Sequence, residues 1–132
     1  MAADDQQPAQ TSNPMILIVD DDLSSIRILE MGLKRAGYQT VVTPTGREAL
    51  EIIQSHRPDL ILMDDFLPVL AGSELCRRLK YNPETATIPI ILASAGERIR
   101  DQALMQEIRV DYVLSKPFNL TELIQIVGSL LG

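Results

Sequence analysis

The sequence has one cysteine and no tryptophan, and only 4% of its 132 residues are aromatic. A single cysteine, Cys76, excludes an internal disulfide and fits a reducing compartment such as the cytoplasm. The scarcity of aromatic side chains argues against a surface on which nucleic-acid bases stack. Lys and Arg are also scarce: 12 of them against 18 Asp and Glu give a formal net charge of −6. This charge argues against direct binding to nucleic acid.

Long apolar runs are missing as well. No run approaches the roughly 18 residues that a membrane-spanning helix needs, so we expect no membrane contact. The N-terminus lacks the basic and then apolar order of a secretory signal peptide. Residues 1–14 are polar, rich in Gln and Pro and without periodicity, which predicts a disordered leader. The remaining residues, 15–132, have the length of one domain, and 45% of the whole sequence is hydrophobic.

Within 15–132, five short apolar runs alternate with amphipathic segments. Several of the runs are continuous, which is typical of parallel strands that are buried on both faces. The strands are expected at residues 15–19, 38–42, 60–63, 88–93 and 112–114. Helical patterns cover residues 24–36, 46–55, 72–81, 97–108 and 119–130. Five βα units predict an α/β fold with a doubly wound sheet and helices on both faces, because parallel crossovers are right-handed.

Two local expectations can be checked against the structure. In the first helix, Ile28, Leu29, Leu33 and Ala36 make the apolar stripe that should face the sheet. The connection "KYNPETATIP", residues 80–89, is rich in turn residues and is expected to be an exposed loop.

Polar side chains follow four of the five strands. Ligands of doubly wound sheets bind beyond the carboxyl ends of the strands, so these side chains are candidates for one site. They are Asp20, Asp21 and Asp22 after the first strand, Asp64 and Asp65 after the third, Ser94 after the fourth and Lys116 after the fifth.

Such a cluster has a chemical logic. Several neighbouring carboxylates cannot all stay ionised unless a cation joins them, and oxygen ligands suit Mg²⁺, which commonly bridges carboxylates to phosphate. Lys116 and Ser94 would bind an anion beside the metal. A carboxylate can itself attack phosphorus and form an acyl phosphate. The pattern therefore predicts a site for Mg²⁺ and a phosphoryl group.

At this point the sequence resembles a known family. Residues 15–132 are similar to the receiver domain of two-component response regulators, in its stand-alone, chemotaxis-type form. The motifs that carry the resemblance are "ILIVDDD", "PDLILMDDFLP", "IPIILASA" and "SKPF", in that order. The resemblance implies a flavodoxin-like sheet of order 2-1-3-4-5 and a function in phosphorelay signal transduction. It also implies that the protein is not an enzyme toward outside substrates.

The resemblance assigns roles to the acidic residues. Asp64, four residues before Pro68, would be the phosphoacceptor. Asp20 and Asp21 would hold Mg²⁺, with Asp64 and the main-chain carbonyl of Phe66 as further ligands. Because three aspartates are adjacent, the pair Asp21 and Asp22 is the alternative.

The remaining roles fall on the last two strands. Ser94 would be the switch hydroxyl and Lys116 the phosphate-binding lysine, with a cis bond between Lys116 and Pro117. The aromatic residue that the family places three positions before the lysine is replaced by Val113. Tyr112 lies one position early, and strand residues alternate faces, so it should not substitute.

Two further departures concern the third strand and the helix after it. Asp65 stands where the family usually has an apolar residue, and its carboxylate either adds to the negative field or points to solvent. Ala71, before Gly72, replaces an Asp whose role in the family is usually structural.

The expected partners are a histidine kinase or phosphotransfer protein, which would donate the phosphoryl group, and a downstream protein of unknown identity. The protein would be a monomer or a weak dimer. The alternative function is that of a pseudo-receiver, an interaction module that works unphosphorylated. A phosphohydrolase is disfavoured, since such enzymes usually have an acid two residues beyond the nucleophile, where this chain has Phe66.

Overall fold

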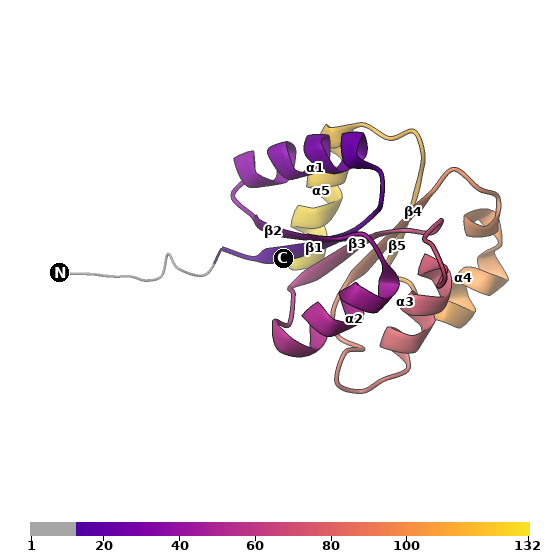
Figure 1. Ribbon diagram of the computed structural model, residues 1–132. Coiled ribbons are helices and arrows are strands. Elements are labelled where there is room, and N and C mark those ends of the chain that lie inside the picture. Colours follow the sequence, from indigo (N-terminus) through magenta and orange to yellow (C-terminus); the bar gives the residue numbers. More distant parts are fainter. Residues whose placement is uncertain (1–12) are drawn as a thin grey trace.

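Five parallel strands form the sheet at the centre of the protein (Figure 1). The computed structural model describes residues 13–132, so residues 1–12 of the expected leader lie outside the described residues. The strands are β1 (Met15–Val19), β2 (Gln39–Thr43), β3 (Leu60–Asp64), β4 (Ile90–Ser94) and β5 (Tyr112–Ser115). Their order in the sheet is β2-β1-β3-β4-β5, which confirms the doubly wound, flavodoxin-like fold.

Helices cover both faces of the sheet (Figure 1). They are α1 (Leu23–Arg35), α2 (Gly46–Ser55), α3 (Gly72–Lys80), α4 (Gln102–Ile108) and α5 (Leu120–Leu131). One layer, α1 and α5, packs against Ile16 and Ile18 of β1, and the other, α2 to α4, packs against Leu17 and Val19. Because successive strand residues face opposite layers, β1 is apolar at every position. Within residues 13–132, none of the helices has the length and apolar content that crossing a bilayer would take.

The buried face of α1 differs from the predicted stripe. Leu29 and Leu33 are buried as predicted, and Ile26 joins them. Ile28, in contrast, is 60% exposed, and Met31 is similarly exposed. Positions 26, 29 and 33 follow the spacing of one helical face, whereas residue 28 lies about 100° around the axis from residue 29. The sequence prediction was wrong for Ile28, which lies on the exposed side of α1, and for Ala36, which is the exposed C-cap residue of the helix.

The segment predicted as one helix over residues 97–108 is divided. A short 3₁₀ turn, η2 (Arg98–Arg100), precedes α4. Between them, Asp101 has an extended backbone, and its side chain accepts a hydrogen bond from the Leu104 N–H. An aspartate that caps a helix in this way favours a new start over continuation, which explains the division.

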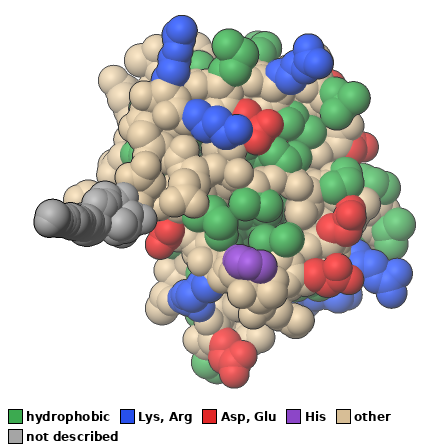
Figure 2. All heavy atoms as spheres, turned by 60° about the vertical axis from the view of Figure 1, so that its left-hand side comes forward, with side chains coloured by type: hydrophobic (Ala, Val, Ile, Leu, Met, Phe, Trp, Pro, Cys, Tyr) green, Lys and Arg blue, Asp and Glu red, His purple; other side chains and the backbone are tan. Residues whose placement is uncertain are grey.

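The single cysteine and the single histidine have no part in a candidate site. Cys76 is buried in the core layer of α3, and burial raises the pKa of its thiol to about 12, so it stays protonated. His56 lies at the surface beyond α2 (purple in Figure 2), where its Nδ1 is 2.9 Å from Ser55 Oγ. Among the described residues it belongs to no group of side chains that could hold a metal.

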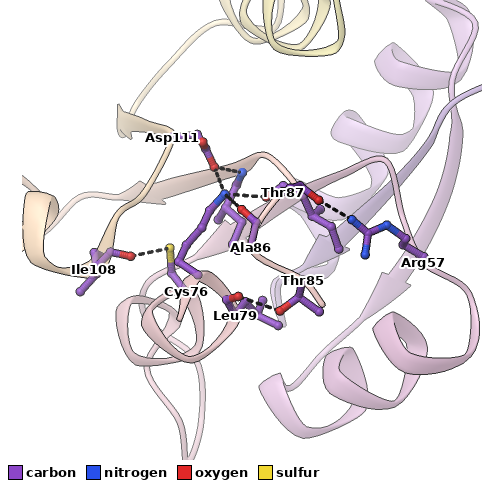
Figure 3. A network of polar contacts seen from close by, with 11 residues as sticks. Arg57, Cys76, Leu79, Thr85, Ala86, Thr87, Ile108 and Asp111 are labelled. Atoms are coloured by element: carbon purple, nitrogen blue, oxygen red, sulfur yellow. Dashed lines mark hydrogen bonds and ion pairs between the residues drawn. The ribbon is translucent and has the colours of Figure 1, made fainter. Parts of the chain in front are cut away.

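A buried lysine lies at the amino-terminal edge of the sheet, opposite the strand ends that carry the candidate site. Two residues that it contacts, Ala86 and Asp111, are labelled in Figure 3. Lys80 Nζ donates to the carbonyls of Ala86 and Ile88 and pairs with Asp111, whose carboxylate also accepts from the Ile90 N–H. The side chain of Lys80 is only 6% exposed. The expectation that residues 80–89 are an exposed loop was therefore wrong at Lys80, because its four-carbon stem reaches partners that only the tertiary fold supplies.

We expect Lys80→Met to lower the free energy of unfolding by about 2 kcal/mol, because it leaves the Asp111 carboxylate and two carbonyls without their shared donor. The measurement is urea denaturation at neutral pH. Arg78→Met is the matched control, since Arg78 is exposed and its ion pair with Glu74 lies at the surface; it should cost less than about 0.5 kcal/mol. A loss below about 0.5 kcal/mol in Lys80→Met would show that the contacts of Lys80 add no more stability than a surface ion pair.

Candidate functional site

The order of the sheet brings three carboxylates together. β1 and β3 are neighbours in register, with Val19 beside Met63, so the residues that follow them meet at one edge. One carboxylate oxygen from each of Asp20, Asp21 and Asp64 lies within 4.8 Å of the others. Asp20 is buried, Asp64 is partly buried and Asp21 is exposed. Three oxygen ligands with one open side have the character of a Mg²⁺ site.

Asp22 is used differently from its two neighbours. It is the N-cap of α1, and its carboxylate accepts hydrogen bonds from the Ser24 N–H and from the hydroxyls of Ser24 and Ser25. These bonds lower the pKa of Asp22. Its N–H, in turn, donates to Asp20 Oδ1 at 3.0 Å. Of the two alternative pairs, the geometry thus brings Asp20 and Asp21 to Asp64 and leaves Asp22 with the helix.

The acidic cluster has an unfavourable charge balance without a cation. The pKa of Asp20 is raised above its ordinary value, mainly by burial and further by the carboxylates of Asp64 and Asp21. The Asp22 N–H and Lys116 oppose this shift. A carboxyl group whose folded-state pKa is raised destabilises the fold at neutral pH, and this cost disappears below its ordinary pKa, where both states are protonated. A bound cation would remove the same cost at neutral pH.

Lys116 extends from the end of β5 to the third carboxylate. Its Nζ lies 3.5 Å from Asp64 Oδ2, and its main-chain N–H donates to the carbonyl of Ser94. The bond between Lys116 and Pro117 is cis, as predicted. Asp64 is thereby the one described carboxylate that lies both in the acidic cluster and against a lysine.

Ser94 lies at the same edge but is held by its own loop. It is the last residue of β4 and is buried, and its Oγ accepts a hydrogen bond from the Gly96 N–H at 2.9 Å. Its strand neighbour Ala93 pairs with Asp64. Ser94 is joined to Lys116 through the main chain rather than through its hydroxyl.

Phe66 stands at the mouth of the site. Its N–H points at Asp64 Oδ1 at 3.3 Å, and its side chain is 61% exposed. The ring lies over Gly96, where an added Cβ would come within 2.8 Å of the ring's Cζ. A glycine at position 96 therefore lets the aromatic ring bridge the loops after β3 and β4.

A cavity of about 430 Å³ opens beside the cluster. Asp20, Asp64 and Lys116 form its charged wall, and Ile28 and Pro117 contribute to the apolar wall. One wall of the cavity can thus hold an ionic group while the other accepts an apolar surface. Ile28, which the sequence pattern wrongly assigned to the buried face of α1, lies on this apolar wall.

Asp65 is the residue whose role the sequence analysis missed. It is 1% exposed, which excludes the possibility that it points to solvent, and its Oδ1 accepts from the Ser73 N–H at 2.9 Å. A signal for this contact was present in the sequence. Ala71 precedes a helix without offering a capping oxygen, so another acceptor was needed.

Comparisons with known proteins identify the family of this domain. Residues 16–128 match the response regulator receiver domain family. The chain belongs to this family. It is 33% identical over 117 residues to the polar-differentiation response regulator DivK of Brucella anthropi, covering 89% of this chain and 95% of DivK. It is a receiver domain of the response regulators that act in two-component phosphorelays.

Two more proteins are similar to this chain over most of its length. It is 36% identical over 110 residues to the alkaline phosphatase synthesis transcriptional regulatory protein PhoP of Bacillus subtilis, covering 83% of this chain but only 45% of PhoP. The receiver domain of the sensor histidine kinase PA1611 from Pseudomonas aeruginosa is 29% identical, with a TM-score of 0.81. The match covers 92% of this chain and 99% of the PA1611 receiver. The PA1611 structure has a magnesium ion coordinated in the active-site cleft.

In the final strand, Tyr112 and Val113 face opposite sides of the sheet, as the alternation of strand residues predicts. Val113 packs against the core layer of α2 to α4. Tyr112 pairs with Ile91, whose side chain lies in the layer of α1 and α5, and is 40% exposed. Tyr112 therefore faces the opposite side of the sheet from Val113 and cannot take the place of an aromatic residue at position 113.

We expect Asp20→Asn to weaken Mg²⁺ binding by about tenfold or more, because it removes a buried ligand oxygen and its charge. Isothermal titration calorimetry of the receiver with MgCl₂ measures the change. Asp22→Asn is the matched control: it removes the same charge two residues away, keeps a good N-cap and should change the affinity by about twofold or less. A larger loss in Asp22→Asn than in Asp20→Asn would assign the metal to the other pair.

Proposed function

We propose that Asp64 is the phosphoacceptor of this receiver and that a histidine kinase or phosphotransfer protein is the donor. The observation that carries the proposal is the position of Asp64, which lies in the acidic cluster and also 3.5 Å from Lys116. An oxygen of Asp64 would attack the phosphorus of a phosphohistidine. The new bond is an acyl phosphate, and the bond from phosphorus to the imidazole nitrogen breaks, leaving the electron pair on the imidazole.

Mg²⁺ fits the donor set, since Asp20, Asp21 and Asp64 offer three carboxylate oxygens to one point and the main-chain carbonyl of Phe66 is the further ligand that the family resemblance implies. When bound, the ion would neutralise charge that develops on the phosphoryl oxygens. The magnesium ion in the PA1611 receiver supports this assignment.

Lys116 and Ser94 would bind the phosphoryl group once it is attached. Lys116 supplies a positive charge that already lies against Asp64 Oδ2. The Ser94 hydroxyl accepts from Gly96 and keeps its own proton free to donate. Drawing Ser94 toward the phosphoryl group would pull on the loop after β4, and a downstream protein would recognise the altered surface.

The protein would not turn over an outside substrate. Phe66 stands two residues beyond Asp64 and has no group that could transfer a proton to or from water. We place the receiver in the cytoplasm as a monomer or weak dimer, with a protein as its downstream partner.

The test is intact-mass spectrometry after incubation with acetyl phosphate. We expect one phosphoryl adduct that requires Mg²⁺ and is absent from Asp64→Asn, which keeps the shape of the side chain and loses its nucleophilic oxygen. Because some receivers accept only from a kinase, a beryllofluoride titration accompanies it. If neither an adduct nor beryllofluoride binding is found, the pseudo-receiver function replaces this proposal.

We further propose that the Phe66 ring limits access of water to the acyl phosphate. The ring rests on Gly96 at the mouth of the site and offers no hydrogen bond to an attacking water. Phe66→Asn should therefore dephosphorylate about tenfold faster, whereas Phe66→Leu, which stays apolar, should resemble the parent protein. The measurement is the loss of the phosphoryl adduct with time after removal of acetyl phosphate. Slower loss in Phe66→Asn would contradict the shielding role.

A further inference from the structure

The helix α3 begins without a cap of its own. Its N-cap residue is Ala71, whose side chain makes no capping hydrogen bond. The first N–H groups of a helix have no partner within the helix and need acceptors from elsewhere. Here Asp65 supplies two of them: its carbonyl accepts from the Gly72 N–H and its carboxylate from the Ser73 N–H, each at 2.9 Å.

The same residue is tied to the sheet. The Asp65 N–H donates to the carbonyl of Ala93 in β4 at 2.9 Å, and its carbonyl accepts a second bond, from the Leu67 N–H. Asp65 is thus hydrogen-bonded to a neighbouring strand, to its own loop and to the start of α3. Because it directly follows Asp64, these bonds fix the main chain on the carboxyl side of the proposed phosphoacceptor.

The start of α3 also presses against Asp64 itself. A Cβ added to Gly72 would collide with the carbonyl oxygen of Asp64 and would lie 3.0 Å from the Cα of Asp65. Only glycine allows this close approach. The helix and the end of β3 are therefore in direct main-chain contact, and Asp65 holds the helix there through both its carbonyl and its carboxylate.

The burial of Asp65 is not explained by stability alone. Its Oδ2 is buried and has no hydrogen-bond partner among the residues that the structure describes. A buried carboxylate with one unpaired oxygen is costly. The N-terminus of α3 offsets part of this cost, since its dipole favours a negative charge.

We propose that Asp65 is a positioning residue for phosphoryl transfer. By holding α3 against the main chain at Asp64, its carboxylate fixes the direction of the Asp64 side chain relative to Asp20 and Lys116. This inference rests on the proposed function of Asp64 as the phosphoacceptor.

The experiment separates positioning from capping. Asp65→Leu removes the side-chain contact with Ser73, and Asp65→Leu with Ala71→Asp restores a cap to α3 at its usual place without restoring that contact. Asp65→Asn keeps an oxygen that can accept from the Ser73 N–H. For each protein we would measure the thermal midpoint and the rate of phosphorylation by acetyl phosphate at saturating Mg²⁺.

We expect Asp65→Leu to phosphorylate about tenfold more slowly than the parent protein, since small displacements of a reacting group have effects of this size or larger. Its thermal midpoint should fall, and the double variant should regain the midpoint but not the rate. Asp65→Asn should stay within about twofold of the parent rate, because the acceptor is retained.

Two results would overturn the inference. One is a parental rate in Asp65→Leu, and the other is a double variant in which rate and midpoint recover together, which would make Asp65 a cap only. If Asp65→Leu does not fold, the double variant is compared with Ala71→Asp instead. Failure of the parent protein itself to be phosphorylated would count against the proposed function, not against the role of Asp65, whose capping contribution the thermal midpoints still measure.

Discussion

Repulsion among the carboxylates at the end of the sheet is the constraint on which the rest of the site depends. Asp20 is buried beside Asp64, and Asp21 adds a third negative charge within the same 4.8 Å. Lys116 balances at most one of these charges, and it lies on the side of Asp64. At neutral pH this arrangement carries an electrostatic cost that a bound cation would remove, so cation binding at this edge would add to stability.

The sheet order is what creates this crowding. β1 lies between β2 and β3, so the first and third βα loops open side by side although more than 40 residues separate them in the chain. Chain connections leave β1 and β3 toward opposite layers, and the gap between them is where ligands of doubly wound sheets bind. The loop after β4 closes the other side, because Phe66 lies on Gly96 and Arg98 donates to the Ser73 hydroxyl. Through these contacts, a structural change at Asp64 can reach residues 96–98 without involving β5.

Local sequence pattern was sufficient for the strands, their polar ends and most helices, since these follow from periodicity and from the chemistry of adjacent residues. It failed where partners come from distant segments. Ile28 matched a helical stripe but lines a cavity whose other walls are β-strand ends and Pro117. Lys80 belongs to a segment, residues 80–89, whose composition is typical of a loop. Only the packed fold brings Asp111, 31 positions later, to its ammonium group. No pattern within a single segment encodes either contact.

The two acidic runs show how the same residue type serves two purposes. In each run the earlier aspartates face the site, and the last one caps the following helix: Asp22 accepts from the Ser24 N–H of α1, and Asp65 accepts from the Ser73 N–H of α3. A strand end that must present carboxylates is followed here by a helix whose N–H groups need acceptors. One further aspartate meets that need and also anchors the helix to the loop that carries the candidate ligands. The surplus of negative charge in "DDD" and "DD" is therefore divided between the candidate metal site and the N-termini of the two helices that follow it.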